Sequence, residues 1–164
     1  MRGFTLIELM ITILIAAILL ALGVPSFSYV TANIRMANDI DALLGDIRFA
    51  RSEAVKEGQS VTICASDSSS SYQSCNGNSN WETGWIVYSS SPNNPLRVKQ
   101  AFKAGETLTS SNGLSQVTFN REGFPSNGSI FTLHSANSDT RLTRCVTMSV
   151  VGQLTSNFYS PPCP

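Results

Sequence analysis

Charged residues are scarce in this sequence, and the two signs balance. Asp, Glu, Lys and Arg make up 13% of the 164 residues, and the 11 basic and 11 acidic side chains give a formal net charge of zero. A neutral chain exerts no general electrostatic attraction on nucleic acid or anionic lipid. Because 42% of the residues are hydrophobic, a chain that is disordered throughout is also excluded. The length fits one domain, or a small domain with an appendage.

Patterns for catalysis and metal binding are lacking as well. A serine triad would have to use the single histidine, His134, and there is no Gly-x-Ser-x-Gly elbow to accompany it. The sequence contains no phosphate loop, dinucleotide fingerprint, Cys-x-x-Cys pair or clustered ligand set. We therefore expect no catalytic residue, no cofactor and no metal. A membrane-anchored enzyme is the least favoured interpretation.

A long apolar run occupies the N-terminus. From Leu9 to Val24 the only strongly polar side chain is Thr12. As a helix, residues 4–24 would rise about 31 Å, enough to cross a bilayer core of about 30 Å. A secretory signal peptide or a plain membrane anchor would also be apolar. Neither has a use for Glu8, because an unpaired carboxylate in an apolar run is energetically unfavourable.

The segment Arg2-Gly3-Phe4-Thr5-Leu6-Ile7-Glu8-Leu9 resembles the processing motif of type IV prepilins and type II secretion pseudopilins. In that family a membrane peptidase cuts after the glycine and methylates the new N-terminus. The resemblance implies a leader of residues 1–3, cleavage between Gly3 and Phe4, and N-methylation of Phe4. It also implies that Glu8 meets the Phe4 ammonium of a neighbouring filament subunit. Such a charge pair in a low dielectric is favourable only when both partners are present.

A second helical pattern follows Pro25, where the resemblance implies a bend in the helix. Apolar residues recur in steps of three and four, as on the stripe of an amphipathic helix: Phe27, Val30, Ile34, Ala37, Ile40, Leu44 and Ile47. Polar residues lie largely off this stripe: Arg35, Asn38, Asp39, Asp41, Asp46 and Glu53. We expect one long helix that stops at Gly58. Residues 4–25 would be its transmembrane or filament-core half, and residues 26–58 its amphipathic half.

Short strands are expected beyond Gly58. The runs are separated by Gly, Asn, Ser and Pro, and they are Val61–Ala65, Trp85–Tyr88, Leu96–Phe102, Gln116–Asn120, Ser129–His134 and Cys145–Val151. Residues 66–80 are polar and Ser-rich, which predicts an exposed loop. A helix followed by strands predicts an α+β fold, in which residues 59–164 form a globular domain with an antiparallel sheet packed on the helix stripe.

Four cysteines, Cys64, Cys75, Cys145 and Cys163, allow three disulfide pairings. An even number of cysteines after an export-type N-terminus favours structural disulfides in an oxidising compartment. Among the three pairings we favour Cys64–Cys75, which closes the Ser-rich loop, and Cys145–Cys163, which pins the Pro-rich tail.

Basic residues give one candidate for contact with DNA or a protein partner. Alternation along a strand would place Arg97, Lys99 and Lys103 on one face. Arg141 and Arg144 are possible additions to this face. The alternative is a solvated strand face that protects a sheet edge. Some FimT-like pilins bind DNA through a Gly-Arg-x-Arg motif, but the matching stretch here, Gly152-Gln153-Leu154-Thr155, lacks both arginines. DNA binding is therefore an open alternative that the sequence does not favour.

The segment Arg51-Ser52-Glu53-Ala54 and the pattern from Phe119 through Gly123 to Phe131 resemble the FimT/FimU/GspH group of minor pilins. The resemblance implies a non-enzymatic pilus subunit near the filament tip that helps to prime assembly and supports twitching motility, adhesion or DNA uptake. Its expected partners are other minor and major pilins, prepilin peptidase, the inner-membrane assembly platform and, before assembly, membrane lipid. The expected location is the inner membrane with a periplasmic C-terminal domain, then the surface filament. A GspH-like pseudopilin of type II secretion and a DNA-binding competence pilin are the alternatives.

Overall fold

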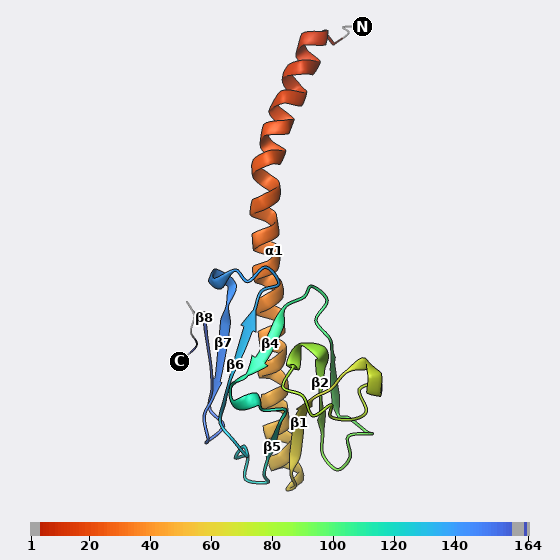
Figure 1. The fold of residues 1–164 in the computed structure, drawn as a ribbon, viewed down its shortest axis with the longest axis vertical. Coiled ribbons are helices and arrows are strands. Elements are labelled where there is room, and N and C mark those ends of the chain that lie inside the picture. Colours follow the sequence, from red (N-terminus) through yellow and green to blue (C-terminus); the bar gives the residue numbers. More distant parts are fainter. Residues whose placement is uncertain (1–3, 159–162, 164) are drawn as a thin grey trace. The chain divides into compact units, whose positions relative to one another are not determined.

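The computed structural model describes residues 4–158 and 163, without the side chains of residues 22–26 and 158. The chain divides into two compact units, Met1–Arg35 and Met36–Pro164, and each is described by itself. One helix, α1, runs from Leu6 to Glu57 and precedes the strands (Figure 1). No helix in the described part of the chain has both the length and the apolarity needed to cross a membrane. The transmembrane half expected at residues 4–25 stays a prediction.

Local sequence sets both ends of α1. The helix begins at Leu6, directly after Thr5, whose hydroxyl accepts a hydrogen bond from the amide N–H of Glu8. It ends at Glu57, and Gly58 follows with φ +66°. Glycine is favoured at that position because only glycine takes the left-handed conformation without a steric penalty. The helix stop expected at Gly58 is confirmed.

In the second unit, one face of α1 is buried. The buried residues recur in steps of three and four: Met36, Ile40, Leu43, Leu44, Ile47, Ala50 and Ala54. The expected stripe is therefore confirmed from Ile40 to Ile47, and two alanines extend it. Three earlier members of the stripe, Phe27, Val30 and Ile34, are exposed instead. They belong to the first unit, which has no strand among its described residues to cover them.

The strands form two antiparallel sheets of four strands each (Figure 1). The first sheet has the order β3 (Arg97–Gln100), β2 (Gly84–Tyr88), β1 (Val61–Ala65) and β5 (Gln116–Phe119). The second has the order β4 (Thr107–Ser110), β6 (Ser129–His134), β7 (Arg144–Met148) and β8 (Leu154–Phe158). The predicted α+β class, with a long N-terminal helix and antiparallel sheet structure, is confirmed.

The strand predictions at Val61–Ala65 and Ser129–His134 coincide with β1 and β6. The sequence does not predict β4 or β8. Their runs, Thr-Leu-Thr-Ser and Leu-Thr-Ser-Asn-Phe, contain few apolar residues. Both strands lie at the edges of the second sheet, where one side is unpaired and polar side chains are tolerated.

Aromatic side chains fill the core of the second unit. Trp81, in the short helix η2 (Trp81–Thr83), is fully buried and packs edge-on against Phe131 of β6, with ring centroids 5.2 Å apart. Its indole N–H donates to the carbonyl of Leu114 at 2.8 Å. The Trp81 side chain therefore joins η2 to the second sheet, and its one polar atom is satisfied.

Candidate functional site

The first turn of α1 holds Glu8 in a capping box. The amide N–H of Glu8 donates to the Thr5 hydroxyl at 3.3 Å, and the amide N–H of Thr5 donates to the Glu8 carboxylate at 3.5 Å. These reciprocal contacts satisfy two N–H groups that the start of a helix leaves unpaired. From the sequence, Glu8 is predicted to act only in filament assembly. The Thr-x-x-Glu spacing is the signal that indicates this second role.

Two predicted site positions lie outside the described parts of the chain: Gly3, at the cleavage site, and the side chain of Pro25, an assembly residue. Phe4, the expected first residue after cleavage, is described and is 83% exposed. Cleavage after Gly3, methylation of Phe4 and a bend at Pro25 stay predictions.

Large apolar side chains surround the N-terminal part of α1. Each of those between residues 6 and 20 is more than half exposed: Leu6, Ile7, Leu9, Met10, Ile11, Ile13, Leu14, Ile15, Ile18, Leu19 and Leu20. A continuous exposed apolar surface marks an interaction site. The exposed apolar side chains are spread along the whole of this segment, and a helix with this pattern is usually buried on all sides. We call residues 6–20 the apolar helix segment.

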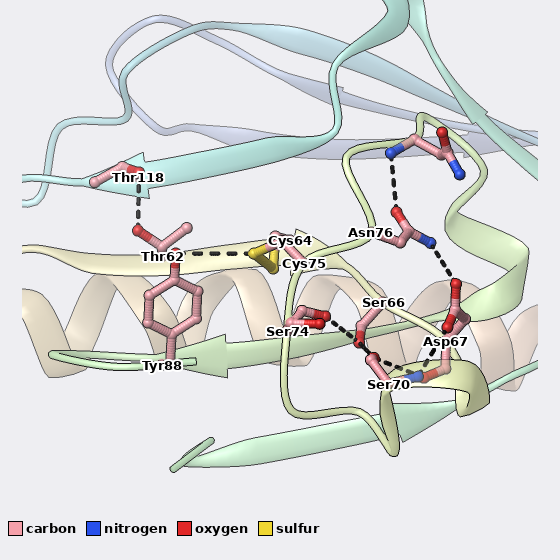
Figure 2. Close-up of a disulfide and its surroundings, with 11 residues drawn as sticks. Thr62, Cys64, Ser66, Asp67, Ser70, Ser74, Cys75, Asn76, Tyr88 and Thr118 are labelled. Atoms are coloured by element: carbon pink, nitrogen blue, oxygen red, sulfur yellow. Dashed lines mark hydrogen bonds between the residues drawn. A yellow bond between two sulfur atoms is a disulfide. The ribbon is translucent and has the colours of Figure 1, made fainter. Parts of the chain in front are cut away.

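The Ser-rich loop is cross-linked and ordered. Cys64 of β1 and Cys75 form a disulfide with Cα atoms 5.6 Å apart (Figure 2). Within the loop, the Asp67 carboxylate accepts hydrogen bonds from the amide N–H groups of Ser69 and Ser70 and from the Ser69 hydroxyl. These bonds, the Ser69 hydroxyl first among them, lower the pKa of Asp67. The turn at the start of this loop is therefore capped by its own acidic residue.

The second disulfide joins Cys145 of β7 to Cys163 in the C-terminal tail, with Cα atoms 5.9 Å apart. The hydroxyl of Thr132 on β6 lies 3.2 Å from the Cys163 sulfur. Both disulfides are the pairings favoured from the sequence among the three possible ones, and the second fastens one residue of the tail to the second sheet.

Removing the first disulfide should destabilise the domain. For the double variant Cys64→Ser/Cys75→Ser we expect the free energy of unfolding to fall by about 2–3 kcal/mol, because the unfolded chain regains the freedom that a short closed loop removes. Denaturant titration of the full chain in a non-ionic detergent measures this change. Ser68→Ala, at an exposed position in the same loop, is the control and should change stability by less than about 0.5 kcal/mol. Equal stability of the double variant and the wild type would contradict the expectation.

The basic residues of β3 are paired with α1. Arg97 Nη1 lies 3.0 Å from Asp46 Oδ1, and the guanidinium carbon lies 3.8 Å from the ring centroid of Phe49. Lys99 Nζ lies 2.9 Å from Asp39 Oδ1. As the alternative interpretation predicts, β3 is an edge strand. Its cations, however, are neutralised by helix carboxylates instead of facing solvent alone.

Contact of Arg97, Lys99 and Lys103 with DNA or a protein partner therefore stays a prediction, and two of these three cations are paired with carboxylates of α1. The strand ends at Gln100, so strand alternation does not extend to Lys103, which is exposed. Of the two additions, Arg141 is bound to Asp139 at 2.8 Å, and burial lowers the pKa of Arg144. The strand pattern alone could not reveal the acidic residues of α1 that lie against it.

Asp46 accepts hydrogen bonds from two partners, and its removal should cost stability. Its Oδ2 accepts the indole N–H of buried Trp85 at 2.9 Å, and its Oδ1 accepts Arg97. For Asp46→Ala we expect a loss of about 2–3 kcal/mol in the free energy of unfolding, mostly because a buried indole N–H loses its acceptor. The same denaturant titration measures this loss. Asp46→Asn, which can still accept from Trp85, should lose less than half as much, and equal losses would contradict this assignment.

An arginine from α1 reaches the turn between β7 and β8. Arg51 Nη1 donates to the carbonyl of Gly152 at 2.9 Å. Gly152 has φ +77°, and a Cβ atom there would lie 3.2 Å from that guanidinium nitrogen, so glycine suits the turn for two reasons. The stretch that begins at Gly152 contains no arginine, but the guanidinium group of Arg51 on α1 lies against it. Sequence reasoning missed this contact because the two residues are 101 positions apart.

His134 ends β6 opposite Thr107. Within residues 4–158 and 163, no group of three or more His, Cys, Asp and Glu side chains could hold a metal ion.

Comparison with known families gives two matches that together span most of the chain. The family described as type II transport protein GspH matches residues 39–152, and the prokaryotic N-terminal methylation motif matches residues 1–24. Among curated proteins, the type IV narrow pilus major component PilA5 of Thermus thermophilus is 40% identical over 63 residues, which are 38% of this chain and 53% of PilA5. The chain thus spans about half the length of that relative.

Solved structures share the fold at low sequence identity. The type IV minor pilin FimU of Pseudomonas aeruginosa is 21% identical, with a TM-score of 0.60 over 80% of this chain and 92% of FimU. The minor pseudopilin EpsH from the type 2 secretion system of Vibrio cholerae is 11% identical, with a TM-score of 0.54 over 76% of this chain and 97% of EpsH. Escherichia coli GspH is 14% identical, with a TM-score of 0.53 over 77% and 90% of the two chains.

Proposed function

This chain belongs to the GspH family of type II transport proteins, within the type IV pilin and pseudopilin group, and we propose that it is a minor subunit of a type IV pilus. The members of this group are structural subunits. The proposed place of this subunit is near the filament tip, where it helps to prime assembly and thereby supports twitching motility, adhesion or DNA uptake.

One observation carries the proposal: an N-terminal methylation motif at residues 1–24 precedes a GspH-type domain at residues 39–152 in the same chain. On this basis prepilin peptidase cuts between Gly3 and Phe4, and Phe4 becomes the methylated N-terminus. The largely apolar surface of the apolar helix segment supports the same proposal, because these exposed apolar side chains favour an apolar surrounding at every stage.

The proposed mechanism moves α1 between two apolar surroundings. Before cleavage, the helix is held in the lipid of the inner membrane with the domain of β strands on the periplasmic side. After cleavage, the assembly platform transfers the helix into a bundle formed by the helices of other minor and major pilins. The Glu8 carboxylate then faces the Phe4 ammonium of a neighbour and sets the register of docking, because each charge is costly in that bundle without the other. Pro25 lets the helix adjust its path.

Glu8 already has a partner before assembly, and this bears on the mechanism. In the single chain its carboxylate faces the Thr5 amide at 3.5 Å, a long hydrogen bond. A weak bond of this kind is easily exchanged for a shorter contact with a charged amine. The capping box therefore holds Glu8 at the helix start without preventing its role between subunits.

The pilus and the secretion pseudopilus are distinguished by phenotype. The 40% sequence identity over 63 residues to a pilus component, PilA5, supports the assignment to a pilus. The alternative is a GspH-like pseudopilin, which the family description supports. Deletion of the gene should abolish or reduce twitching and leave the secretion of type II substrates normal, and a plasmid copy should restore twitching. Loss of secretion with normal twitching would favour the pseudopilin instead.

DNA binding is the less favoured alternative, because the cations of β3 are paired with α1. A gel-shift titration of the full chain in detergent with double-stranded DNA at low salt, where phosphate contacts are strongest, tests it. We expect no shift; a shift that disappears with rising salt would support the competence pilin.

A further inference from the structure

A groove lies along α1 beside the start of β8. Its lining combines apolar and basic side chains and contains no acidic one among the described residues: Ile47, Arg48, Arg51, Ser52, Val55, Lys56, Gly152, Gln153 and Leu154. Ile47 is buried and forms part of the floor, whereas Val55 is 54% exposed. We call this surface the α1–β8 groove. It presents an apolar floor beside positive charge.

The two arginines of this groove have no carboxylate partner among the described residues, whereas its lysine does. Within the described residues, Arg48 is exposed and has no carboxylate partner, and Arg51 donates to a backbone carbonyl. Only Lys56 is paired, with Glu53 at 2.9 Å. Several basic side chains elsewhere each contact a carboxylate: Arg97, Lys99, Arg121 and Arg141. The α1–β8 groove therefore has two guanidinium groups available for an acidic partner.

Two close backbone approaches hold the groove in shape. A Cβ atom on Gly123 would lie 2.9 Å from Val55 Cγ2 and 3.3 Å from Arg51 Nε. A Cβ atom on Gly152 would lie within 3.3 Å of the same guanidinium group. The loops that carry these glycines thus press against α1 and confine the Arg51 side chain. A confined guanidinium loses little conformational freedom when it binds a ligand.

We propose that the α1–β8 groove binds an acidic segment of a neighbouring filament subunit. One carboxylate of that segment meets Arg48 and Arg51, and an apolar side chain next to it covers Val55 and Leu154. A planar guanidinium binds a carboxylate through two parallel hydrogen bonds, and the apolar floor gains from the burial of an apolar side chain. This inference rests on the proposed function, because the filament supplies the neighbouring subunit.

An acidic protein segment fits the groove better than a nucleic acid does. Binding of a phosphate backbone depends on several cations placed along its track, often with aromatic side chains on which bases stack. The α1–β8 groove has two unneutralised guanidinium groups and no aromatic lining residue among the described ones. Its exposed apolar area would contribute nothing to a phosphate contact.

Photo-crosslinking within assembled filaments tests the proposal. In the full chain, exposed Ser52 of the groove is replaced by p-benzoylphenylalanine, the filaments are sheared from irradiated cells, and the adducts are mapped by mass spectrometry. We expect an adduct with an acidic peptide of another subunit. Arg48→Glu should lower its yield at least about fivefold, because two like charges then face each other. Lys103→Glu, an equal change of charge at an exposed site outside the groove, should leave the yield unchanged.

The outcomes separate this inference from the proposed function. Suppose the chain is present in sheared filaments but Ser52 gives no adduct, or an adduct with nucleic acid or a non-acidic peptide. The inference is then overturned and the proposed function stands. A yield that ignores Arg48→Glu, or that falls equally with Lys103→Glu, also overturns it. Absence of the chain from the sheared filaments would refute both the inference about the groove and the proposed function.

Discussion

The Glu8→Ala variant should accumulate in the cell envelope at the normal level and yet be depleted at least about tenfold from sheared filaments. In the proposed bundle it leaves the Phe4 ammonium of a neighbour without its carboxylate, and a lone charge in an apolar surrounding is costly. A loss of about 1.4 kcal/mol already corresponds to a tenfold change in the equilibrium constant for incorporation. Quantitative immunoblots of the filament and envelope fractions measure the ratio.

The capping box offers a second explanation for any effect at Glu8, and a matched variant separates the two. Glu8→Gln removes the charge, but glutamine also serves at this position of a capping box. If the charge pair matters, Glu8→Gln is depleted from filaments as strongly as Glu8→Ala. If Glu8→Gln assembles normally while Thr5→Ala does not, the cap is the essential feature and the charge pair is refuted.

The Trp81→Ala variant should lose about 3–5 kcal/mol in the free energy of unfolding, the largest effect that we expect from a single core substitution. The side chain is fully buried against Phe131, and its indole N–H is bonded to Leu114. Removing it leaves a cavity where η2 meets the second sheet and a carbonyl without its donor. Denaturant titration of the full chain in detergent, followed by far-ultraviolet circular dichroism, measures the loss.

Two controls apply to the Trp81 prediction. Trp81→Phe keeps an aromatic ring near Phe131 but lacks the indole N–H, so it should lose clearly less than Trp81→Ala. Phe124→Ala removes an aromatic ring that is 48% exposed and should cost about 1 kcal/mol or less. A Trp81→Ala variant no less stable than Phe124→Ala would contradict the assignment of Trp81 to the core.

The sequence predicts those helices and strands in which the apolar residues recur at regular spacing or form a continuous run. The steps of three and four in α1 and the apolar runs of β1 and β6 lead directly to these elements. Edge strands are harder to predict, because β4 and β8 are stabilised by pairing with β6 and β7 and not by their own composition. The division of the strands between two sheets likewise depends on distant pairings.

The candidate sites also differ in whether local sequence is enough to predict them. The processing motif is local, and so it can be identified from residues 2–9 alone. The partners of Arg97 and Lys99 lie about 50–60 positions earlier on α1, and strand alternation contains no information about them. The contact of Arg51 with Gly152 spans an even larger separation. Charge pairs between elements far apart in sequence can be identified only from the three-dimensional structure. These pairs decide which cations are available to a partner.

The N-terminus of the chain recovered from sheared surface filaments tests the central claim most directly. Mass spectrometry should give a peptide that begins at N-methylated Phe4 and continues through Glu8 into the apolar helix segment. A chain that still carries residues 1–3, or one from which the whole apolar helix segment has been removed, would contradict the account.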